Sequence, residues 1–369
     1  MATKLCSHFF LLLIFDILHL QSPLYIMSNI TIKEIAKALN LSISSVSKAL
    51  NDSYDISEAT KKRVLAYAKE NGYRPNILAK NLKTGKTNTI GVILSSINKL
   101  FYAQIIEGIQ QYAISVGYDV IFMQSHEQSD KEKSCIEALL LRGIDGLLIA
   151  PINESSNYEL LKSLHESTVP VVIFDRILHN LETVKIGVNN FKGAYLATQH
   201  LIQIGRKKIL NITGSKFGLS SERFKGYKKA LLDFNVPFVP NYYIQCSMQS
   251  YELLDRDLHT ALKNIMSGEL RPNAILCSSD IISVRLLGVL SEMDYSVPDD
   301  LAVIGFSNID FPGSLNPSLS TIRQPTGEIG RLSTEKLIQF IVKKNWKQLD
   351  PETIELETQL TFRKSTAIS

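Results

Sequence analysis

The sequence predicts a multi-domain protein in which a small all-α domain precedes a larger α/β module of two doubly wound lobes. The chain has 369 residues, which exceeds one ordinary domain. Residues 31–88 show helical periodicity, whereas apolar strands alternate with helices from residue 89 onward. The charge is also uneven: residues 31–88 carry eleven Lys and Arg against five Asp and Glu, while residues 89–369 have a net charge of −2. This distribution indicates a polyanionic partner for the first unit only.

The first 26 residues contain an apolar run at 9–15 that only superficially resembles the core of a secretory signal. Asp16 and His19 interrupt the run, no small-residue cleavage site follows, and it is too short to span a membrane. A second methionine, Met27, stands just before the first ordered pattern. We therefore expect translation to begin at Met27 and residues 1–26 to be a mis-assigned extension, with no stable membrane association. A membrane anchor is the minor alternative.

Three helices are expected in the small domain. Apolar residues at 32, 35, 36 and 39 mark one face of a first helix, which a turn at 40–41 ends. Ser42 is placed to cap a second helix that runs to residue 50, and Ser57 a third that runs to residue 71. Gly72 is the expected left-handed stop of that third helix.

Two helices of matching length joined by a three-residue turn follow the helix-turn-helix plan, in which the second helix enters the major groove of DNA. The second helix would project Ile43, Ser44, Ser45, Ser47 and Lys48. The hydroxyl groups suit phosphate or base contacts, and the Lys48 ammonium can reach a guanine acceptor or a phosphate. Periodicity alone is also compatible with a small helical bundle that has a solvated basic face.

The α/β module is predicted from apolar, β-branched runs with helical stretches between them. The runs lie at 89–94, 119–124, 146–151, 171–176, 185–189, 208–214, 242–247, 274–280, 301–306 and 319–324. Continuous apolar strands that alternate with helices imply parallel sheets covered on both faces. Ten strands are too many for one compact sheet in a module of this length, so we expect two similar lobes with a cleft between them.

The residues of the helical domain resemble the signature of the lactose/galactose repressor family. The resemblance runs from Thr31 to Asn51, continues through Ile56–Thr60 and Asn71–Asn76, and extends through the α/β module to about Phe362. It implies a ligand-responsive, sequence-specific DNA-binding transcriptional regulator of carbohydrate-related genes, a repressor by resemblance. The DNA-binding residues that it implies are Thr31, Ser42, Ile43, Ser44, Ser45, Ser47, Lys48, Asn51, Tyr73, Asn76, Ala79 and Leu82.

Residues 76–88 match the hinge helix and linker of that family. The hinge of the family folds on operator DNA and wedges a leucine into the minor groove, a known way to kink the duplex. Leu82 takes that place, and Ala79 lies one turn earlier. A seven-residue helix is marginal in water, so it needs DNA and a partner to form. The resemblance therefore implies a homodimer on palindromic double-stranded operator DNA, while an ordinary polar linker is the alternative reading when DNA is absent.

The second module resembles a periplasmic sugar-binding protein, so the effector is expected to be a sugar or sugar derivative bound at the carboxyl ends of the strands. An aromatic residue after the first strand either stacks on the effector or packs in the core. Asp175 either binds the effector, holds Arg176 or caps a turn, and Asp280 either accepts effector hydroxyls or caps a helix. The effector-binding residues that follow from the resemblance are Asn98, Phe101, Tyr102, Asp175, Arg176, Asn189, Arg223, Asp280, Phe306 and Gln324.

Two departures from the family pattern affect the identity of the effector. Asn189–Asn190 stands where Asp–Asn is common, and Ser307–Asn308 stands where acids are frequent. A carboxylate only accepts hydrogen bonds, whereas an amide also donates them. Replacing one by the other therefore changes which hydroxyl groups of an effector the protein can hydrogen-bond. The effector of one family member therefore cannot be transferred to this chain, and the sign of the response stays open.

Other function classes find little support in the sequence. No nucleophile elbow, Walker A loop or dinucleotide fingerprint follows a predicted strand, so we expect neither an enzyme nor a cofactor. The four cysteines lack metal-ligand spacing, and Cys135, Cys246 and Cys277 are expected to be buried free thiols in a reducing cytoplasm. The strongest alternative is an exported periplasmic sugar-binding protein, which would have no counterpart of residues 31–82.

The expected domain boundaries follow from these segments. Residues 1–26 are the extension, 27–75 the helix-turn-helix domain, 76–88 the hinge and linker, and 89–363 the sensor. Lobe 1 is expected at about 89–187 plus 323–345, and lobe 2 at about 188–320 plus 355–363.

Overall fold

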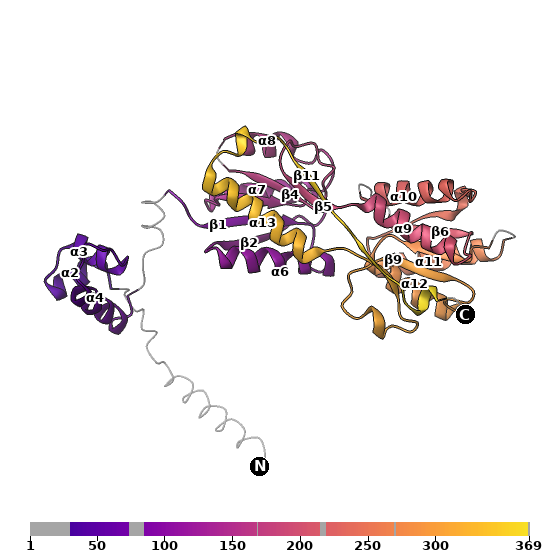
Figure 1. Ribbon diagram of the computed structural model, residues 1–369, viewed down its shortest axis with the longest axis horizontal. Coiled ribbons are helices and arrows are strands. Elements are labelled where there is room, and N and C mark those ends of the chain that lie inside the picture. The colour runs from indigo at the N-terminus through magenta and orange to yellow at the C-terminus, as the bar shows by residue number, and fades with distance from the viewer. Residues whose placement is uncertain (1–29, 74–84, 168, 215–218, 269–270, 368–369) are drawn as a thin grey trace, which may run out of the picture. The chain divides into compact units, whose positions relative to one another are not determined.

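The computed structural model describes residues 30–73, 85–167, 169–214, 219–268 and 271–367. The chain divides into two compact units, residues 1–85 and 86–369. The extension expected at 1–26 and the hinge helix expected at 76–82 lie outside the described residues. We call the helical part, residues 30–73, the head, and the second unit the sensor (Figure 1).

The head contains the three predicted helices with almost the predicted bounds. They are α2 (Ile32–Leu39), α3 (Ile43–Leu50) and α4 (Glu58–Glu70). The side chains of Thr31, Ser42 and Ser57 each accept a hydrogen bond from a backbone N–H in the first turn of the helix that follows, which satisfies one orphan donor at each N-terminus. The three helices enclose a small core around the fully buried side chains of Ile35, Val46 and Val64.

The sensor contains two six-stranded sheets, and all ten predicted strands are present. The first sheet has the order β11-β5-β4-β3-β1-β2 and the second the order β12-β10-β9-β8-β6-β7. The strands are β1 (Thr89–Leu94), β2 (Asp119–Gln124), β3 (Gly146–Ile149), β4 (Val171–Phe174), β5 (Lys185–Val188), β6 (Ile209–Gly214), β7 (Tyr243–Cys246), β8 (Ala274–Cys277), β9 (Ala302–Phe306), β10 (Ser320–Arg323), β11 (Thr353–Leu356) and β12 (Gln359–Thr361). The pairing is parallel except between β12 and β10.

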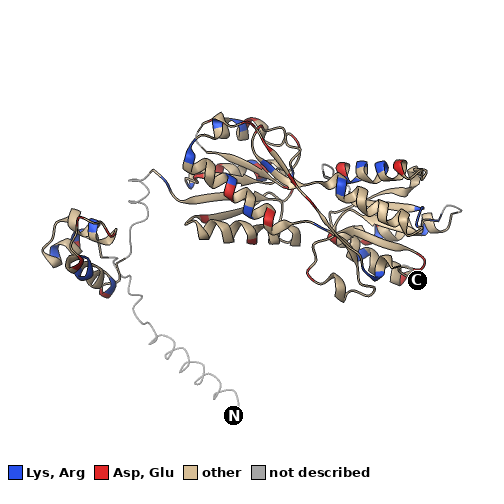
Figure 2. Cartoon of the chain, in the orientation of Figure 1, with Lys and Arg blue, Asp and Glu red and all other residues tan. Residues whose placement is uncertain are grey.

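Helices cover both faces of each sheet, as the apolar strands require. In lobe 1, α6 (Leu100–Ser115) and α13 (Thr326–Lys343) pack on one face, and α7 (Ser129–Leu141) and α8 (Tyr158–Ser167) on the other. In lobe 2, α9 (Asn190–Gln203) and α10 (Leu219–Asp233) pack opposite α11 (Tyr251–Met266) and α12 (Asp280–Glu292). The exposed sides of α10 and α13 carry both basic and acidic residues, which form i,i+3 and i,i+4 ion pairs (Figure 2).

Three crossings join the lobes, and they correct the expected lobe boundaries. The chain crosses between β5 and α9, between β10 and α13, and between β11 and β12. Residues 355 and 356 were expected in lobe 2, but they belong to β11, which pairs with β5 in the first sheet. Residues 321–323 belong to β10 of the second sheet, so lobe 2 does not end at 320. The backbone N–H of Asn189 donates to the carbonyl of Leu356 at 3.0 Å, tying the first crossing to the third.

The sensor also extends beyond the expected end at residue 363. Ser365 is fully buried, and its hydroxyl donates to the carbonyl of Val303 on β9 at 2.6 Å. The hydroxyls of Ser320 and Thr366 bond each other at 2.7 Å. The three thiols expected to be buried are buried and free.

Glycines let two helix pairs approach very closely. A Cβ atom on Gly108 of α6 would lie 2.3 Å from the carbonyl oxygen of Gly327, and one on Gly330 of α13 would lie 2.2 Å from that of Ile105. In lobe 2, a Cβ on Gly226 of α10 would lie 2.1 Å from the carbonyl oxygen of Phe191 on α9. Backbone atoms cannot give way as a flexible side chain can, so these positions exclude larger residues.

We expect Gly108→Ala to lower the free energy of unfolding by about 1–3 kcal/mol, because the added methyl group must push two backbones apart. Gly288→Ala is the matched control: this glycine lies on the exposed side of α12 with nothing within 4 Å of a built Cβ. Alanine there should stabilise the helix by about 0.5–1 kcal/mol. Urea denaturation followed by circular dichroism measures both changes, and equal effects of the two substitutions would contradict the close contact.

Candidate functional site

The exposed face of α3 is the candidate DNA-reading surface of the head. Val46 and Ala49 point into the head core, whereas Ile43 is half exposed and Ser44 and Lys48 are exposed. Because the side chain of Ile43 stays exposed, it contributes little to the stability of the folded head and is available to contact a partner. The surface expected from the sequence at 43, 44 and 48 therefore faces solvent.

Several other residues expected to bind DNA have structural roles in the head. Thr31 forms a capping box with Glu34, in which its backbone N–H donates to the Glu34 carboxylate at 2.6 Å. The hydroxyls of Ser42 and Ser45 bond each other at 2.8 Å. The Asn51 amide donates to the carbonyl of Ser47 at 2.8 Å, and Tyr73 packs against the head core. Asn76, Ala79 and Leu82 lie outside the described residues.

Acidic residues of the loop after α3 and of the first turn of α4 hold two lysines of the head. The ammonium of Lys48 lies 2.9 Å from the Asp55 carboxylate, and the hydrogen bond from Lys48 lowers the pKa of Asp55. The largely buried Lys61 pairs with Asp52 at 2.7 Å and with Glu58 at 3.0 Å. Lys48 must therefore exchange a carboxylate for any phosphate that it binds.

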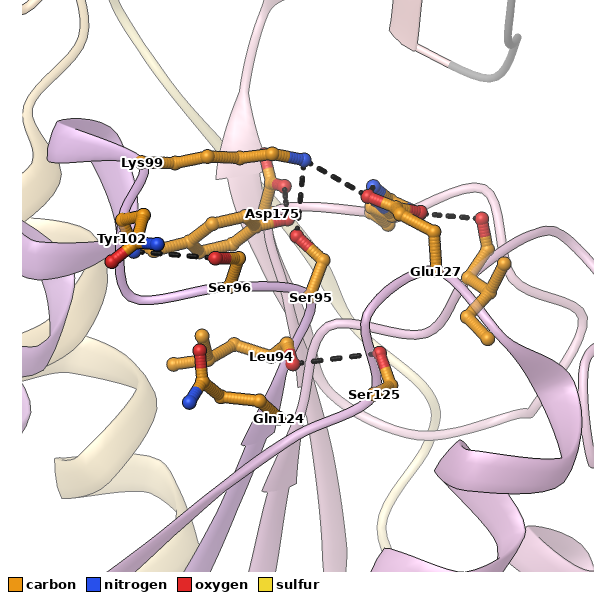
Figure 3. A network of polar contacts seen from close by, with 12 residues as sticks. Leu94, Ser95, Ser96, Lys99, Tyr102, Gln124, Ser125, Glu127 and Asp175 are labelled. Carbon is orange, nitrogen blue, oxygen red and sulfur yellow. Dashed lines mark hydrogen bonds and ion pairs between the residues drawn. The ribbon is translucent and has the colours of Figure 1, made fainter. Parts of the chain in front are cut away.

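In lobe 1, a buried tyrosine and aspartate meet where β4 ends. The Tyr102 hydroxyl donates to Asp175 at 2.8 Å, and both side chains are buried (Figure 3). Asp175 has a φ of 62°, in the left-handed region that costs a non-glycine residue conformational energy. Burial raises the pKa of Asp175, although the charge of Arg176 and the bond from Tyr102 oppose this change. A strained backbone at a buried carboxylate is typical of a functional position.

Beside this pair, one carboxylate holds two cations. Glu127 accepts two hydrogen bonds from Arg176, at 2.7 and 3.0 Å, and one from the Lys99 ammonium at 3.0 Å (Figure 3). Burial alone would raise the pKa of Glu127, but the hydrogen bonds and charge of Arg176, followed by those of Lys99, lower it to about 2. Arg176 also donates to the carbonyls of Pro151 and Ile152. Glu127, and not Asp175, is therefore the residue that holds Arg176.

In lobe 2, Arg223 is the central group. Its guanidinium donates to the side chains of Asn190 at 2.7 Å and Gln324 at 3.2 Å, and to the carbonyl of Ser278. It stacks on the Phe306 ring, 3.8 Å from the ring centroid. Burial lowers the pKa of Arg223 to about 10, against the opposing charges of Asp175 and Asp280. Arg223 thus remains a cation at neutral pH and interacts with one carboxylate from each lobe.

Asp280 begins α12 just after the carboxyl end of β8 and is half-buried. Burial raises the pKa of Asp280, and the hydrogen bond from the backbone N–H of Asn308 opposes this change. Neither role considered for Asp280 is seen directly: α12 is capped at Ser279 without a side-chain hydrogen bond, and the Asp280 carboxylate instead accepts the backbone N–H of Asn308. Its contact with an effector stays a prediction.

A cluster of side-chain amides, which we call the latch, joins the lobes. Gln104 of α6 donates to the Asn308 carbonyl at 3.0 Å and to the Asp310 carboxylate at 2.9 Å. Its amide oxygen accepts from Asn308 at 3.2 Å and from the Thr326 hydroxyl at 3.0 Å. The Asn308 amide also bonds both backbone groups of Gln324, at 2.8 and 3.0 Å. An amide both donates and accepts here, whereas a carboxylate could only accept, which explains Asn308 at a position where acids are frequent in the family.

The structure brings together some of the residues expected at the effector site. Arg223 donates a hydrogen bond to Gln324, and the charges of Asp175 and Asp280 act on Arg223. The six remaining residues have other surroundings: Asn98 is exposed, Asn189 caps α9, Phe101 is half-buried, the Tyr102 ring lies in the lobe 1 core, Arg176 is bound to Glu127, and Phe306 is buried beneath Arg223.

Sequence reasoning missed Glu127, Lys99, Asn190 and Gln104. Glu127 follows the carboxyl end of β2, so the strand-end rule that selected Asp175 and Asp280 would also have selected it. Gln104 carried no such signal, because one glutamine within a helix is ordinary.

The comparisons with known proteins assign the family. Residues 31–76 match the family described as bacterial regulatory proteins, lacI family, and residues 198–366 match a periplasmic binding protein-like domain. The HTH-type transcriptional repressor PurR of Photobacterium profundum is 31% identical over 91% of this chain and 98% of its own length. The chain belongs to the lacI family.

Solved structures agree with this membership of the lacI family. The transcription regulator CcpA of Lactococcus lactis is 28% identical, with a TM-score of 0.66 over 76% of this chain and 99% of its own. A lac repressor dimer bound to operator and the anti-inducer ONPF shares the fold, with a TM-score of 0.79 over 92% of this chain and 99% of its own at 21% identity. The chain is a ligand-responsive DNA-binding regulator, and the alternative of an exported binding protein is not favoured.

Within the part of the chain that the structure describes, no group of three or more His, Cys, Asp or Glu side chains is arranged to hold a metal ion. The helices of those same residues include none that is long and apolar enough to cross a membrane.

We expect Asn308→Asp to open the latch. The aspartate loses the hydrogen bonds that Asn308 donates and places a second carboxylate near Asp280, so the free energy of unfolding should fall by about 2–3 kcal/mol. Hydrogen exchange at the backbone N–H of Gln324, which donates to the side chain of Asn308, should accelerate. Gln249→Glu, in an exposed loop, is the control for the change in charge. Unchanged exchange at Gln324 in Asn308→Asp would contradict the role of the latch.

The low pKa of Glu127 predicts a pH dependence. Because this pKa is about 2 in the folded protein against an ordinary 4.5, Glu127 stabilises the fold above pH 4.5 and loses this effect as the pH falls towards 2. Glu127→Gln should therefore lower the melting temperature at pH 7, and the gap to the wild type should narrow below about pH 4.5. Thermal melts from pH 7 downward test this, and a gap that does not change with pH would refute it.

Proposed function

We propose that the chain is a homodimeric repressor that binds a palindromic operator through α3 and changes its operator affinity when a small molecule binds between the sensor lobes. Two observations support the proposal: the latch joins the lobes through hydrogen bonds, and the charges of Asp175 in lobe 1 and Asp280 in lobe 2 both act on Arg223. Because both lobes supply polar groups to one place, a ligand there interacts with both and biases their relative arrangement.

We assign base-specific DNA contacts and nonspecific electrostatic attraction to DNA to different segments of the chain. Ile43, Ser44 and Lys48 supply the exposed reading face. Residues 30–73 contain seven Lys and Arg and five Asp and Glu, so most of the positive excess lies in 74–86, which has four basic residues and no acid. That charge supports salt-dependent affinity for any duplex. We assign base readout to α3 and, following the family resemblance, a minor-groove wedge to Leu82.

The effector is proposed to be a polyhydroxy compound such as a sugar or a sugar derivative. Asp175 and Asp280 offer carboxylate acceptors and Arg223 offers donors, which is the combination that a ring of hydroxyl groups satisfies. Coupling between this site and the operator is typically worth about 1–3 kcal/mol. Genes of carbohydrate metabolism are accordingly the proposed targets.

Selection from random duplexes by the full chain, followed by operator titrations with a panel of sugars, tests the proposal. Enrichment of an inverted repeat and a shift of operator affinity by at least one sugar are expected. Enrichment of a single half-site would overturn the homodimer, and no enrichment of any sequence would overturn DNA reading. A thermal-shift screen of the same panel identifies the sugar, since a ligand stabilises the folded sensor according to its occupancy.

We expect Lys48→Ala to weaken operator binding and to reduce the slope of log affinity against log salt by about 1, if Lys48 meets a phosphate. Asp55→Asn is the matched comparison, because it removes the carboxylate that holds Lys48 without removing the cation. Binding by Asp55→Asn should be at least as tight as in the wild type. Fluorescence anisotropy at several salt concentrations measures both, and an unchanged slope in Lys48→Ala would rule out the phosphate contact.

A further inference from the structure

The side chains of Lys99 and Arg176 form an anion-binding site that the protein fills with its own carboxylate. Arg176 grips both oxygens of Glu127, and Lys99 binds one of them at 3.0 Å (Figure 3). A guanidinium fork together with an ammonium group is also the arrangement that proteins use to bind a phosphate or a carboxylate of a ligand. Glu127 therefore stands where an anionic group would otherwise bind.

Glu127 is held in this place by the surrounding backbone. His126 and Glu127 have φ values of 48° and 58°, two consecutive left-handed residues that are neither glycine nor asparagine. The N–H groups of Ser125 and His126 donate to the carbonyls of Leu94 and Ser95, both at 2.9 Å. Lys99 also donates to the Ser95 hydroxyl at 3.2 Å. The loop thus has unfavourable dihedral angles at the position where its Glu127 carboxylate contacts both Lys99 and Arg176.

The same group of charges adjoins the candidate effector site. The charges of Arg176, Arg223 and Lys99 all act on Asp175, and the Lys99 ammonium lies 5.9 Å from the centroid of the Tyr102 ring. This group of charges consists of three cations, Lys99, Arg176 and Arg223, and three carboxylates, Glu127, Asp175 and Asp280. Its formal charge is zero, and it would be +1 without Glu127.

We propose that Glu127 is a specificity-determining residue: it neutralises Lys99 and Arg176 from within the protein and so restricts the effector to uncharged polyhydroxy compounds. Phosphorylated or carboxylated versions are excluded because they would have to displace a carboxylate that is held by three hydrogen bonds. This inference deepens the proposed function and rests on it, since it concerns the charge of the effector that the lobes bind.

The test uses the full chain with Glu127→Gln, which keeps the size of the side chain and removes its charge. Glu137→Gln on α7 is the control, because that glutamate is exposed and lies 4.0 Å from its lysine partner. The probes are inorganic sulfate against chloride at equal ionic strength, and D-glucose and D-ribose against their terminal phosphates. Thermal shift and calorimetry report binding, and operator titration reports function.

Sulfate is expected to stabilise Glu127→Gln and to leave the wild type and Glu137→Gln unchanged. The affinity of Glu127→Gln for a phosphorylated sugar should exceed that of the wild type by about tenfold or more, consistent with one uncompensated charge in a partly buried site. A folded Glu127→Gln that gains no affinity for sulfate overturns the inference. If this variant does not fold, the test is made on the wild-type chain, by comparing its affinity for each sugar with its affinity for the phosphate of that sugar. Tighter binding of the phosphorylated sugar overturns the inference, and tighter binding of the unphosphorylated sugar supports it.

Failure of the proposed function gives a different result. A chain that selects no DNA sequence, or whose operator affinity responds to none of the sugars, refutes the proposed function even if sulfate binds Glu127→Gln as expected. Conversely, an effector that proves to be a phosphorylated sugar leaves the regulator intact and refutes only the role of Glu127.

Discussion

The positive charge of Arg223, on a half-buried side chain, constrains the arrangement of the residues around it. Its guanidinium needs acceptors, which Asn190 and Gln324 provide, and a surface to lie on, which Phe306 provides. Compensating charge comes from Asp175 and Asp280, one in each lobe. Because a buried charge is costly unless it is paired and hydrogen-bonded, the lobes cannot separate without altering its surroundings. The sensitivity of the sensor to a ligand follows from this dependence.

Local sequence patterns predicted most of the fold and only part of the site. The ten strands of continuous apolar residues and the helices with Ser42 and Ser57 as caps were found because burial and capping leave local marks. The strands β11 and β12 were missed because each is a short edge strand with exposed and half-buried residues rather than a buried run. At the site, residues at strand ends were predictable. The burial of the Tyr102 ring and the position of Gln104 depend on how α6 packs, which no local pattern encodes.

The helix α6 combines roles that are usually distributed over several elements. Its glycine contact with α13 fixes the distance between two helices of lobe 1, its Tyr102 binds Asp175, and its Gln104 reaches Asn308 and Asp310 of lobe 2. Since Gln104 and Tyr102 are on the same short stretch, a movement at the effector site and a movement between the lobes are mechanically linked. Close helix packing makes such a linkage stiff, because packed interiors transmit displacement rather than absorb it.

The edge strands β11 and β12 have a consequence for how the sensor is made. The first sheet is assembled from residues 89–188, yet it gains β11 only at 353–356, and the second gains β12 at 359–361. On a ribosome, both sheets would remain one strand short until residues 353–361 had been synthesised. The two lobes would therefore gain their last strands almost together, and chaperones would meet them with an incomplete sheet until then.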